Sequence, residues 1–241
     1  MKPTRKKTVR ISNGAIEGFV KKNNAIAIKI MLYVATHQRN ELNSELFEFT
    51  LDTREVCKVC NIDLKTLRQN IVQMTETSIN FQYGEGRKKT NSYITVIPHA
   101  TFDHNNNLVV KIFREIKELI NDVKNKFTII DVPQLMNLKS KQSIRMLEIL
   151  EMINCFDYNI PKRKQYDLEE LNGMFGTKYK KINDFEKAIL KIAKEELDNN
   201  SNIGFEYSIK YDKNDNRAGR PSAKWIIIDL IKIKNLQPKL F

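Results

Sequence analysis

Residues 167–198 read DLEELNGMFGTKYKKINDFEKAILKIAKEELD, and this stretch predicts two helices joined by a glycine-containing turn. Glu170 follows Asp167 by three residues, which is a capping-box pattern: each carboxylate accepts a hydrogen bond from the other residue's backbone amide. The first helix is expected to end near Gly173 or Gly176, because glycine tolerates the left-handed conformation at a helix C-terminus.

The second helix is expected over residues 180–198, because apolar side chains recur there at helical spacing. Its expected inward positions are Ile182, Phe185, Ile189, Ile192 and Ala193. Its expected outward positions are Lys180, Asp184, Lys187, Lys191 and Lys194. The helix would thus have an apolar face for packing and, opposite it, a single stripe of four lysines and one aspartate for solvent or a polyanion.

The neighbouring segments complete a recognisable order. A helix is predicted over residues 141–154, and a short extended segment is predicted near Gln165 and Tyr166. Two strands are predicted over residues 204–211 and 223–231. Helix, short strand, capped helix, helix and hairpin is the order of a winged helix-turn-helix. In that motif the second helix of the pair is the recognition helix and the hairpin is the wing.

The same order occurs in the first half of the chain. Two unrelated α+β units could share this order by chance, but two successive matches with the same capping pattern favour a repeat. We therefore predict an α+β fold with two tandem winged helix-turn-helix domains related by an internal pseudo-repeat. The first copy comprises a helix over 24–39, a strand over 46–51, the capping pair Asp52 and Glu55, a second helix from Asp63, and strands over 79–83 and 92–97 around a basic tip.

The domain boundary is expected around residues 113–130, where residues 115–120 resemble a linking helix. The prediction has four parts: a basic flexible arm at 1–12, a first winged-helix domain at 13–122, a second at 123–235 and a tail at 236–241.

The charge balance limits the partners of the protein. Its 41 Lys and Arg exceed its 29 Asp and Glu, which gives a net charge of +12 and favours nucleic acid or an anionic membrane surface. No apolar run reaches the ~18 residues of a membrane span, and no predicted helix pairs a bulky apolar face with a broad cationic one. The three cysteines are an odd and small number, which favours a reducing compartment. The basic N-terminus is not followed by the apolar segment of a signal peptide. We therefore expect a cytoplasmic protein.

Candidate DNA contacts lie on both predicted recognition helices and both hairpin tips. Cations there suit phosphates, and polar side chains in the first helical turns suit base edges. In the second domain these residues are Lys180, Lys181, Asn183, Asp184, Lys187 and Lys191 on the helix, and Arg217, Arg220 and Lys224 on the hairpin. In the first domain they are Lys65, Thr66, Arg68 and Gln69 on the helix, where Val72 and Glu76 dilute the charge, and Arg87 and Lys88 on the hairpin. The alternative is an ordinary solvated surface.

Patterns for catalysis, metal or cofactor binding are not found. Cys57 and Cys60 form a C-x-x-C without the second cysteine pair or the histidines of a zinc site, so we expect both to pack in a short helix. The sequence has no P-loop and no histidine pair of a rolling-circle nickase. Trp225 is expected in the core. We predict a binding protein with no cofactor, not an enzyme.

Three motifs resemble a known family: LKSKQSIRMLEIL at 138–150, YKKINDFEKAIL at 179–190, and GRP at 219–221 before the final strand. Together they resemble the theta-type, iteron-binding replication initiator proteins of bacterial plasmids, over about residues 8–235. The resemblance implies two winged-helix domains, a main base-reading helix that includes Tyr179 and extends to Lys194, and a backbone-contacting wing at 217–224. Glu186 lies among positions that are often basic in the family.

The resemblance also implies a mechanism. Monomers of such initiators bind direct repeats (iterons) with both domains, help to open an adjacent AT-rich segment, and recruit the host initiator and helicase. Dimers, joined mainly through the first domain, bind an inverted repeat and repress their own gene. We therefore predict a replication initiator whose partners are double-stranded origin DNA, a second copy of itself and these host proteins. The alternatives are a double winged-helix transcriptional regulator without a replication role, and a nuclease or nickase.

Overall fold

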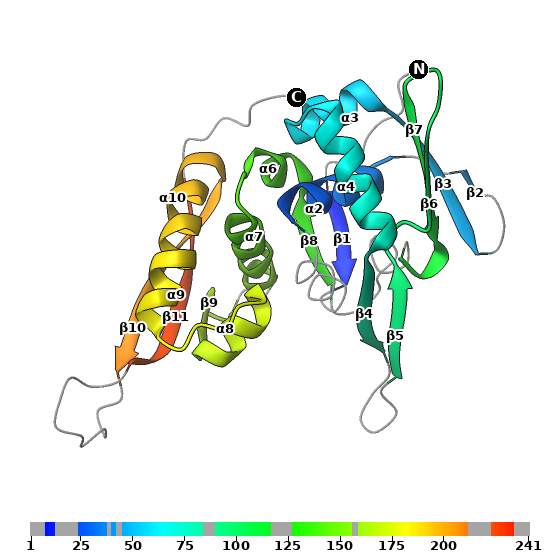
Figure 1. The fold of residues 1–241 in the computed structure, drawn as a ribbon. Helices are drawn as coiled ribbons and strands as arrows, with labels where there is room; N and C mark the ends of the chain where they lie inside the picture. Colours follow the sequence, from blue (N-terminus) through cyan, green and yellow to red (C-terminus); the bar gives the residue numbers. More distant parts are fainter. Residues whose placement is uncertain are drawn as a thin grey trace. The chain divides into compact units, whose positions relative to one another are not determined.

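The structure is a computed structural model that describes residues 8–12, 24–37, 40–41, 45–83, 90–116, 127–155, 159–211 and 223–233. The chain divides into two compact units, Met1–Met136 and Asn137–Leu240 (Figure 1). This division lies after Met136, whereas the sequence placed the boundary at residues 122–123, because the strand at 127–131 pairs within the first unit. Within the described residues, no helix combines the length and apolar character that a membrane span requires.

Strand β1 (Thr8–Ser12) pairs antiparallel with β8 (Phe127–Asp131) in the first unit. Val9 lies opposite Ile130, and both side chains are buried. The assignment of residues 8–12 to a flexible arm is therefore corrected. The sequence did not reveal this strand, because residues 8–12 form a short basic segment and the strand that buries Val9 lies more than 100 residues along the chain.

Helix α2 (Ala25–Ala35) is capped by Asn24, whose side chain accepts a hydrogen bond of 2.9 Å from the Ala27 amide. It is buried on nearly every side, and even the Lys29 ammonium is inside, where it donates to a backbone carbonyl at 2.8 Å. The helix ends at Ala35 rather than near residue 39, because the next two amides bond to carbonyls three residues back and close a turn.

Among the described residues, the first unit has a four-stranded antiparallel sheet in the order β2-β3-β7-β6. One face of the central pair is buried and carries alternate apolar side chains of both strands. The hairpin of β6 and β7 was not predicted, although its apolar residues alternate with more exposed ones. The strands are β2 (Asn40–Glu41), β3 (Leu46–Asp52), β6 (His99–Phe102) and β7 (Asn107–Phe113).

The predicted helix pair of the first unit consists of α3 (Thr53–Cys60) and α4 (Leu64–Glu76). Asp52 caps α3, and Asp63 caps α4 by accepting from the Thr66 amide at 2.6 Å. Strands β4 (Ser78–Tyr83) and β5 (Thr90–Thr95) follow as an antiparallel hairpin, the predicted wing.

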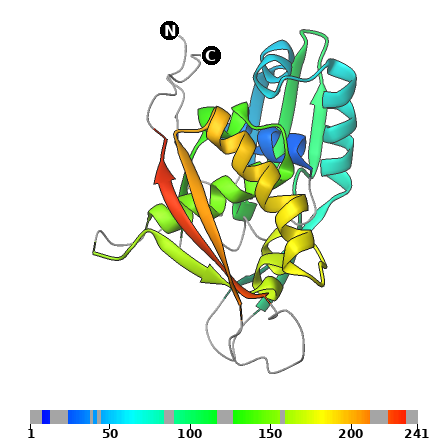
Figure 2. The ribbon, with the colours of Figure 1, turned by 90° about the vertical axis from the view of Figure 1, so that its left-hand side faces the viewer.

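The second unit is built around α7 (Lys141–Asn154), which Ser140 caps and which is buried along most of its length. Its sheet has the order β10-β11-β9, with β9 (Arg163–Tyr166), β10 (Ile203–Tyr211) and β11 (Ala223–Lys232). Helix α8 (Leu168–Phe175) precedes a long helix that packs on α7 and β10 (Figure 2). The short α6 (Val132–Asn137) lies where the two units divide.

The long helix contains a π-helical turn. Its three segments follow without a break: α9 (Ile182–Phe185), η2 (Glu186–Leu190) and α10 (Lys191–Asn200). Ile192 was predicted to face inward and is instead 42% exposed, while Leu190 and Ala193 are buried. That prediction is wrong because the wider π turn holds an extra residue and rotates the helix beyond it. The helix also begins at Ile182, so Lys180 and Lys181 precede it.

Candidate nucleic-acid interface

The helix-turn-helix of the second unit begins with the predicted capping box. Asp167 accepts from the Glu170 amide at 2.7 Å, and Glu170 accepts from the Asp167 amide at 2.9 Å. Gly176 ends α8 with φ 65°, a left-handed conformation that favours glycine. Of the two glycines that the sequence offered as the helix end, Gly176 is therefore the one used.

Asn172 organises the turn that leads to the long helix. Its side-chain oxygen accepts from the Tyr179 amide at 2.9 Å and from the Thr177 hydroxyl at 2.7 Å, and its side-chain amide donates to the Tyr179 carbonyl at 2.8 Å. One side chain therefore fixes the backbone just ahead of Lys180 and Lys181. Sequence reasoning missed Asn172, because its partners are set by the shape of the turn.

Three candidate contacts lie ahead of the helix. Tyr179 is half-buried, with its ring centre 5.9 Å from that of Phe185, while Lys180 and Lys181 are exposed. Lys181 occupies the N-cap position without a side-chain cap bond. The positive end of the helix dipole therefore lies beside two lysines, which makes this end of the helix suited to an anion.

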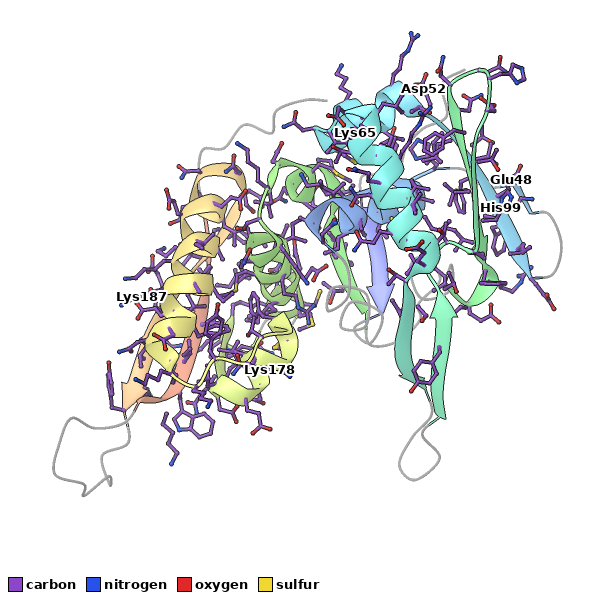
Figure 3. All side chains as sticks on the ribbon, viewed as in Figure 1. Glu48, Asp52, Lys65, His99, Lys178 and Lys187 are labelled. Atoms are coloured by element: carbon purple, nitrogen blue, oxygen red, sulfur yellow. The ribbon has the colours of Figure 1, made fainter. Side chains whose placement is uncertain are left out.

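The N-terminal half of the helix carries the other candidates. Asn183, Asp184, Lys187 and Lys191 are all exposed. Lys187 lies on the outer side of the helix (Figure 3). The structure thus places the candidates from Lys180 to Lys191 along one end of the helix and the turn before it.

Lys194 does not belong to this surface. Its ammonium donates to the Phe205 carbonyl at 3.0 Å and pairs with Glu206 at 2.8 Å and with Asp198 at 3.1 Å. Partial burial would lower the pKa of Lys194, but the bonds to these two carboxylates raise it overall. The expectation of an outward lysine at 194 is therefore wrong, since this side chain ties the helix to strand β10.

Glu186 lies on the helix but is bound by other residues of the unit. The Tyr207 hydroxyl donates to Glu186 at 2.9 Å, and the Lys191 ammonium lies 3.9 Å from the same carboxylate oxygen. Burial and the bond to Glu186 raise the pKa of Tyr207 to about 12. The acidic side chain is thus partly neutralised and connected to the wing strand β10.

The candidate residues of the first unit lie on α4. Lys65, Arg68 and Gln69 are exposed and Thr66 is half-buried. Lys65 lies in the first turn of the helix (Figure 3). The Arg68 guanidinium lies over the Phe102 ring, 5.4 Å from its centre, so this cation is partly held by β6.

The hairpin candidates are only partly described. Arg87, Lys88, Arg217 and Arg220 lie outside the described residues. Lys224 is exposed near the start of β11, with its ammonium 6.0 Å from the centre of the Trp225 ring. Trp225 is half-buried, so its placement in the core was wrong: it stands near the end of the hairpin, where the core no longer covers the strand.

A buried ion pair on α7 contacts the first helix of the helix-turn-helix, α8. The Arg145 guanidinium donates to Glu148 at 3.0 Å and to the Met174 carbonyl in the last turn of α8 at 2.9 Å. Both charged side chains are buried. Burial raises the pKa of Glu148 to about 7, although Arg145 opposes this shift. Sequence reasoning missed the pair, because it predicted both residues only as parts of a helix.

Within the described residues, no three His, Cys, Asp or Glu side chains are grouped so that they could hold a metal ion. Cys57 is half-buried and Cys60 is buried in α3, and burial raises the pKa of the Cys60 thiol to about 12. Both cysteines thus pack in the short helix, as expected.

Two family models cover most of the chain. The model described as "Initiator Replication protein, WH1" matches residues 8–151, and "Initiator Rep protein, WH2" matches residues 167–234. The protein belongs to the replication initiator family. The prediction of an α+β fold with two tandem winged-helix domains is confirmed, as is the family resemblance.

A solved structure has the same fold. This initiator is similar to the protein in "Crystal structure of Pi initiator protein in complex with iteron DNA", with 14% sequence identity and a TM-score of 0.73. The alignment covers 96% of this chain and 100% of the Pi chain. No curated protein matches the sequence.

Proposed function

We propose that this initiator binds direct repeats of double-stranded origin DNA in the cytoplasm with both of its domains, and that it then promotes opening of the origin. The observation that carries the proposal is the set of exposed lysines just before the long helix and on its N-terminal half: Lys180, Lys181, Lys187 and Lys191. The fold shared with Pi, whose structure was solved with iteron DNA, supports it.

In this proposal the two domains have different tasks. The helix of the second domain enters a major groove, where Asn183 and Lys187 reach base edges and the other lysines contact phosphates. The first domain supplies weaker contacts through Lys65, Thr66, Arg68 and Gln69, and it also joins two copies in the dimer that represses the initiator's own gene. The hairpin residues Arg87, Lys88, Arg217, Arg220 and Lys224 contact the backbone beside the grooves. Tyr179 and Asp184 complete the set at the start of the helix.

Footprinting on the DNA that flanks the gene tests the proposal. We expect protection of several direct repeats, each of about two helical turns, because two recognition helices occupy successive major grooves. Protection of an inverted repeat alone would instead support a transcriptional regulator. Permanganate probing of the adjacent AT-rich segment in supercoiled plasmid then tests opening, and unreactive thymines in the bound plasmid would contradict it.

The salt dependence tests how the DNA is held. If about six phosphates are neutralised, the slope of log K against log salt is about −5. Inserting ~5 bp in the middle of one repeat rotates the two halves half a turn apart and should reduce the affinity to that of one domain. Unchanged affinity after the insertion would contradict two-domain binding. Supercoiled plasmid incubated with the protein and Mg²⁺ should stay unnicked, and nicks would indicate a nuclease.

A further inference from the structure

The outward face of α4 carries an apolar side chain, Val72, that is not buried in the core. Leu67, Ile71 and Met74 are buried and form the inward face of this helix, whereas Val72 is 56% exposed. A single exposed valine is ordinary on a protein surface. Val72, however, lies on the second helix of a helix-turn-helix in a replication initiator, where an exposed side chain can contact DNA bases.

Some of the polar side chains next to Val72 interact with other residues of the first unit, and one does not. Arg68 lies over Phe102, and the Gln73 side chain accepts a hydrogen bond of 3.2 Å from Asn24. The Gln69 side chain is exposed and, within the described residues, has no hydrogen-bond partner. Gln69 and Val72 are three residues apart and therefore adjacent on one face.

The two recognition helices differ at these positions. Gln69 is the sixth residue of α4, and Lys187 is the sixth residue of the long helix. Val72 corresponds to Lys191 once the extra residue of the π turn is counted. The second domain therefore presents cations where the first domain presents an amide and two methyl groups.

These two side chains match the major-groove edge of A·T pairs. A glutamine amide bonds in bidentate fashion to adenine N6 and N7, and an apolar side chain contacts the thymine 5-methyl group. Three residues of helix rise by about 4.5 Å, close to the ~3.4 Å between base pairs, so neighbouring pairs are within reach of both residues. A protein partner fits less well, because the two exposed apolar side chains of α4, Val72 and Leu64, lie among polar residues and cannot supply the ~800 Å² that a stable interface buries on each side.

We propose that Gln69 and Val72 determine specificity in the first domain: Gln69 reads an adenine, and Val72 reads the 5-methyl group of a thymine in an adjacent base pair. The inference rests on the proposed function, because it requires α4 to enter a major groove. It adds that the first domain selects bases through groups without net charge, so its specificity persists at salt concentrations that weaken phosphate contacts.

Single-atom changes in the DNA test the proposal with the full-length chain. The probe is a repeat that footprinting has located, synthesised with deoxyuridine at one thymine at a time or 7-deazaadenine at one adenine at a time. Wild-type protein should lose about fourfold in affinity at one uridine position, the size expected for one methyl group. It should lose about fivefold at a neighbouring 7-deazaadenine, since one bond of a bidentate pair is lost.

Protein variants identify the side chain that reads each group. Val72→Ala should bind the thymine and uridine probes equally while keeping the 7-deazaadenine effect, and Gln69→Ala should show the reverse. Ile192→Ala is the matched control, because it removes an exposed aliphatic side chain from the other recognition helix and should keep both effects. Circular dichroism should show all three variants folded, because alanine is favourable in a helix.

Three outcomes overturn different claims. If uridine weakens Val72→Ala and wild type equally at every thymine, the proposed reading by Val72 is wrong, while repeat binding stands. If 7-deazaadenine weakens Gln69→Ala as much as wild type, the role of Gln69 is wrong. If footprinting finds no protected repeat, the proposed function itself fails.

Discussion

The Tyr207 hydroxyl on wing strand β10 donates a hydrogen bond of 2.9 Å to the carboxylate of Glu186 in the π turn of the recognition helix. A carboxylate that faced DNA would repel phosphates. The bond instead directs this charge toward the wing, and Lys191 lies 3.9 Å from the same oxygen. The recognition helix thus keeps a cationic surface although its sequence contains an acid.

The first prediction follows from this bond. Tyr207→Phe should weaken DNA binding about twofold to tenfold, the range of one ordinary hydrogen bond, because Glu186 is freed to approach the phosphates. Fluorescence anisotropy with a repeat duplex measures the change. Adding Glu186→Gln to the same chain removes the charge and should restore most of the affinity. Equal binding by wild type and Tyr207→Phe would show that the bond has no effect on this surface.

The second prediction contrasts two lysines of one helix. Lys187→Ala should cost ~1–3 kcal/mol of discrimination at one base position, because Lys187 is exposed and we propose that its side chain reaches a base edge. Lys194→Ala should leave the salt slope of binding unchanged and lower the melting temperature, because its ammonium is bound to Glu206 and Asp198. Binding titrations over a range of salt, together with thermal unfolding, separate the two. A lower salt slope for Lys194→Ala would place that lysine on DNA.

The third prediction concerns the turn before the recognition helix. Asn172→Ala should reduce the free energy of unfolding by ~1–3 kcal/mol, because it leaves the Tyr179 amide and carbonyl without this partner. DNA affinity should fall as well, since the backbone ahead of Lys180 loses its support. Urea unfolding measures the loss. Asn172→Asp keeps the acceptor but not the donor and should be intermediate, and a variant as stable as wild type would rule out this role.

The fourth prediction is a pH dependence of stability. The pKa of Glu148 is raised to about 7 in the folded protein, so the folded state binds a proton that the unfolded chain releases from about pH 4.5. Glu148 therefore makes its full contribution to the free energy of unfolding below about pH 4.5. This contribution declines as the pH rises from about 4.5 to about 7, by roughly 3 kcal/mol in total.

Glu148→Gln provides the control for this dependence. Glutamine does not titrate, and its oxygen still accepts from Arg145, so the difference in unfolding free energy between variant and wild type should grow as the pH rises. Urea unfolding from pH 5 to pH 8 measures it. Parallel pH curves for the two proteins would show that Glu148 does not titrate in this interval.

The sequence by itself determined the features that depend on neighbouring residues. The capping pair Asp167 and Glu170, the cap Asp52, the start of α4 near Asp63, and helix α7 lie where their patterns predicted. Together with the order of elements, these signals were sufficient for two winged helices. The physical reason is that a cap or an apolar stripe involves residues three or four apart, so its stabilising energy depends only on a short stretch of sequence.

Tertiary structure alone decided the features that depend on distant partners. Strand β1 exists because β8 buries Val9, and Lys194 faces inward because β10 offers it two acceptors. The π turn moves Ile192 outward and Leu190 inward, against the regular helical spacing. In each case a local pattern is compatible with two arrangements. Packing and hydrogen bonds with residues far along the chain select one of them, because the energy of those contacts exceeds the small local preference.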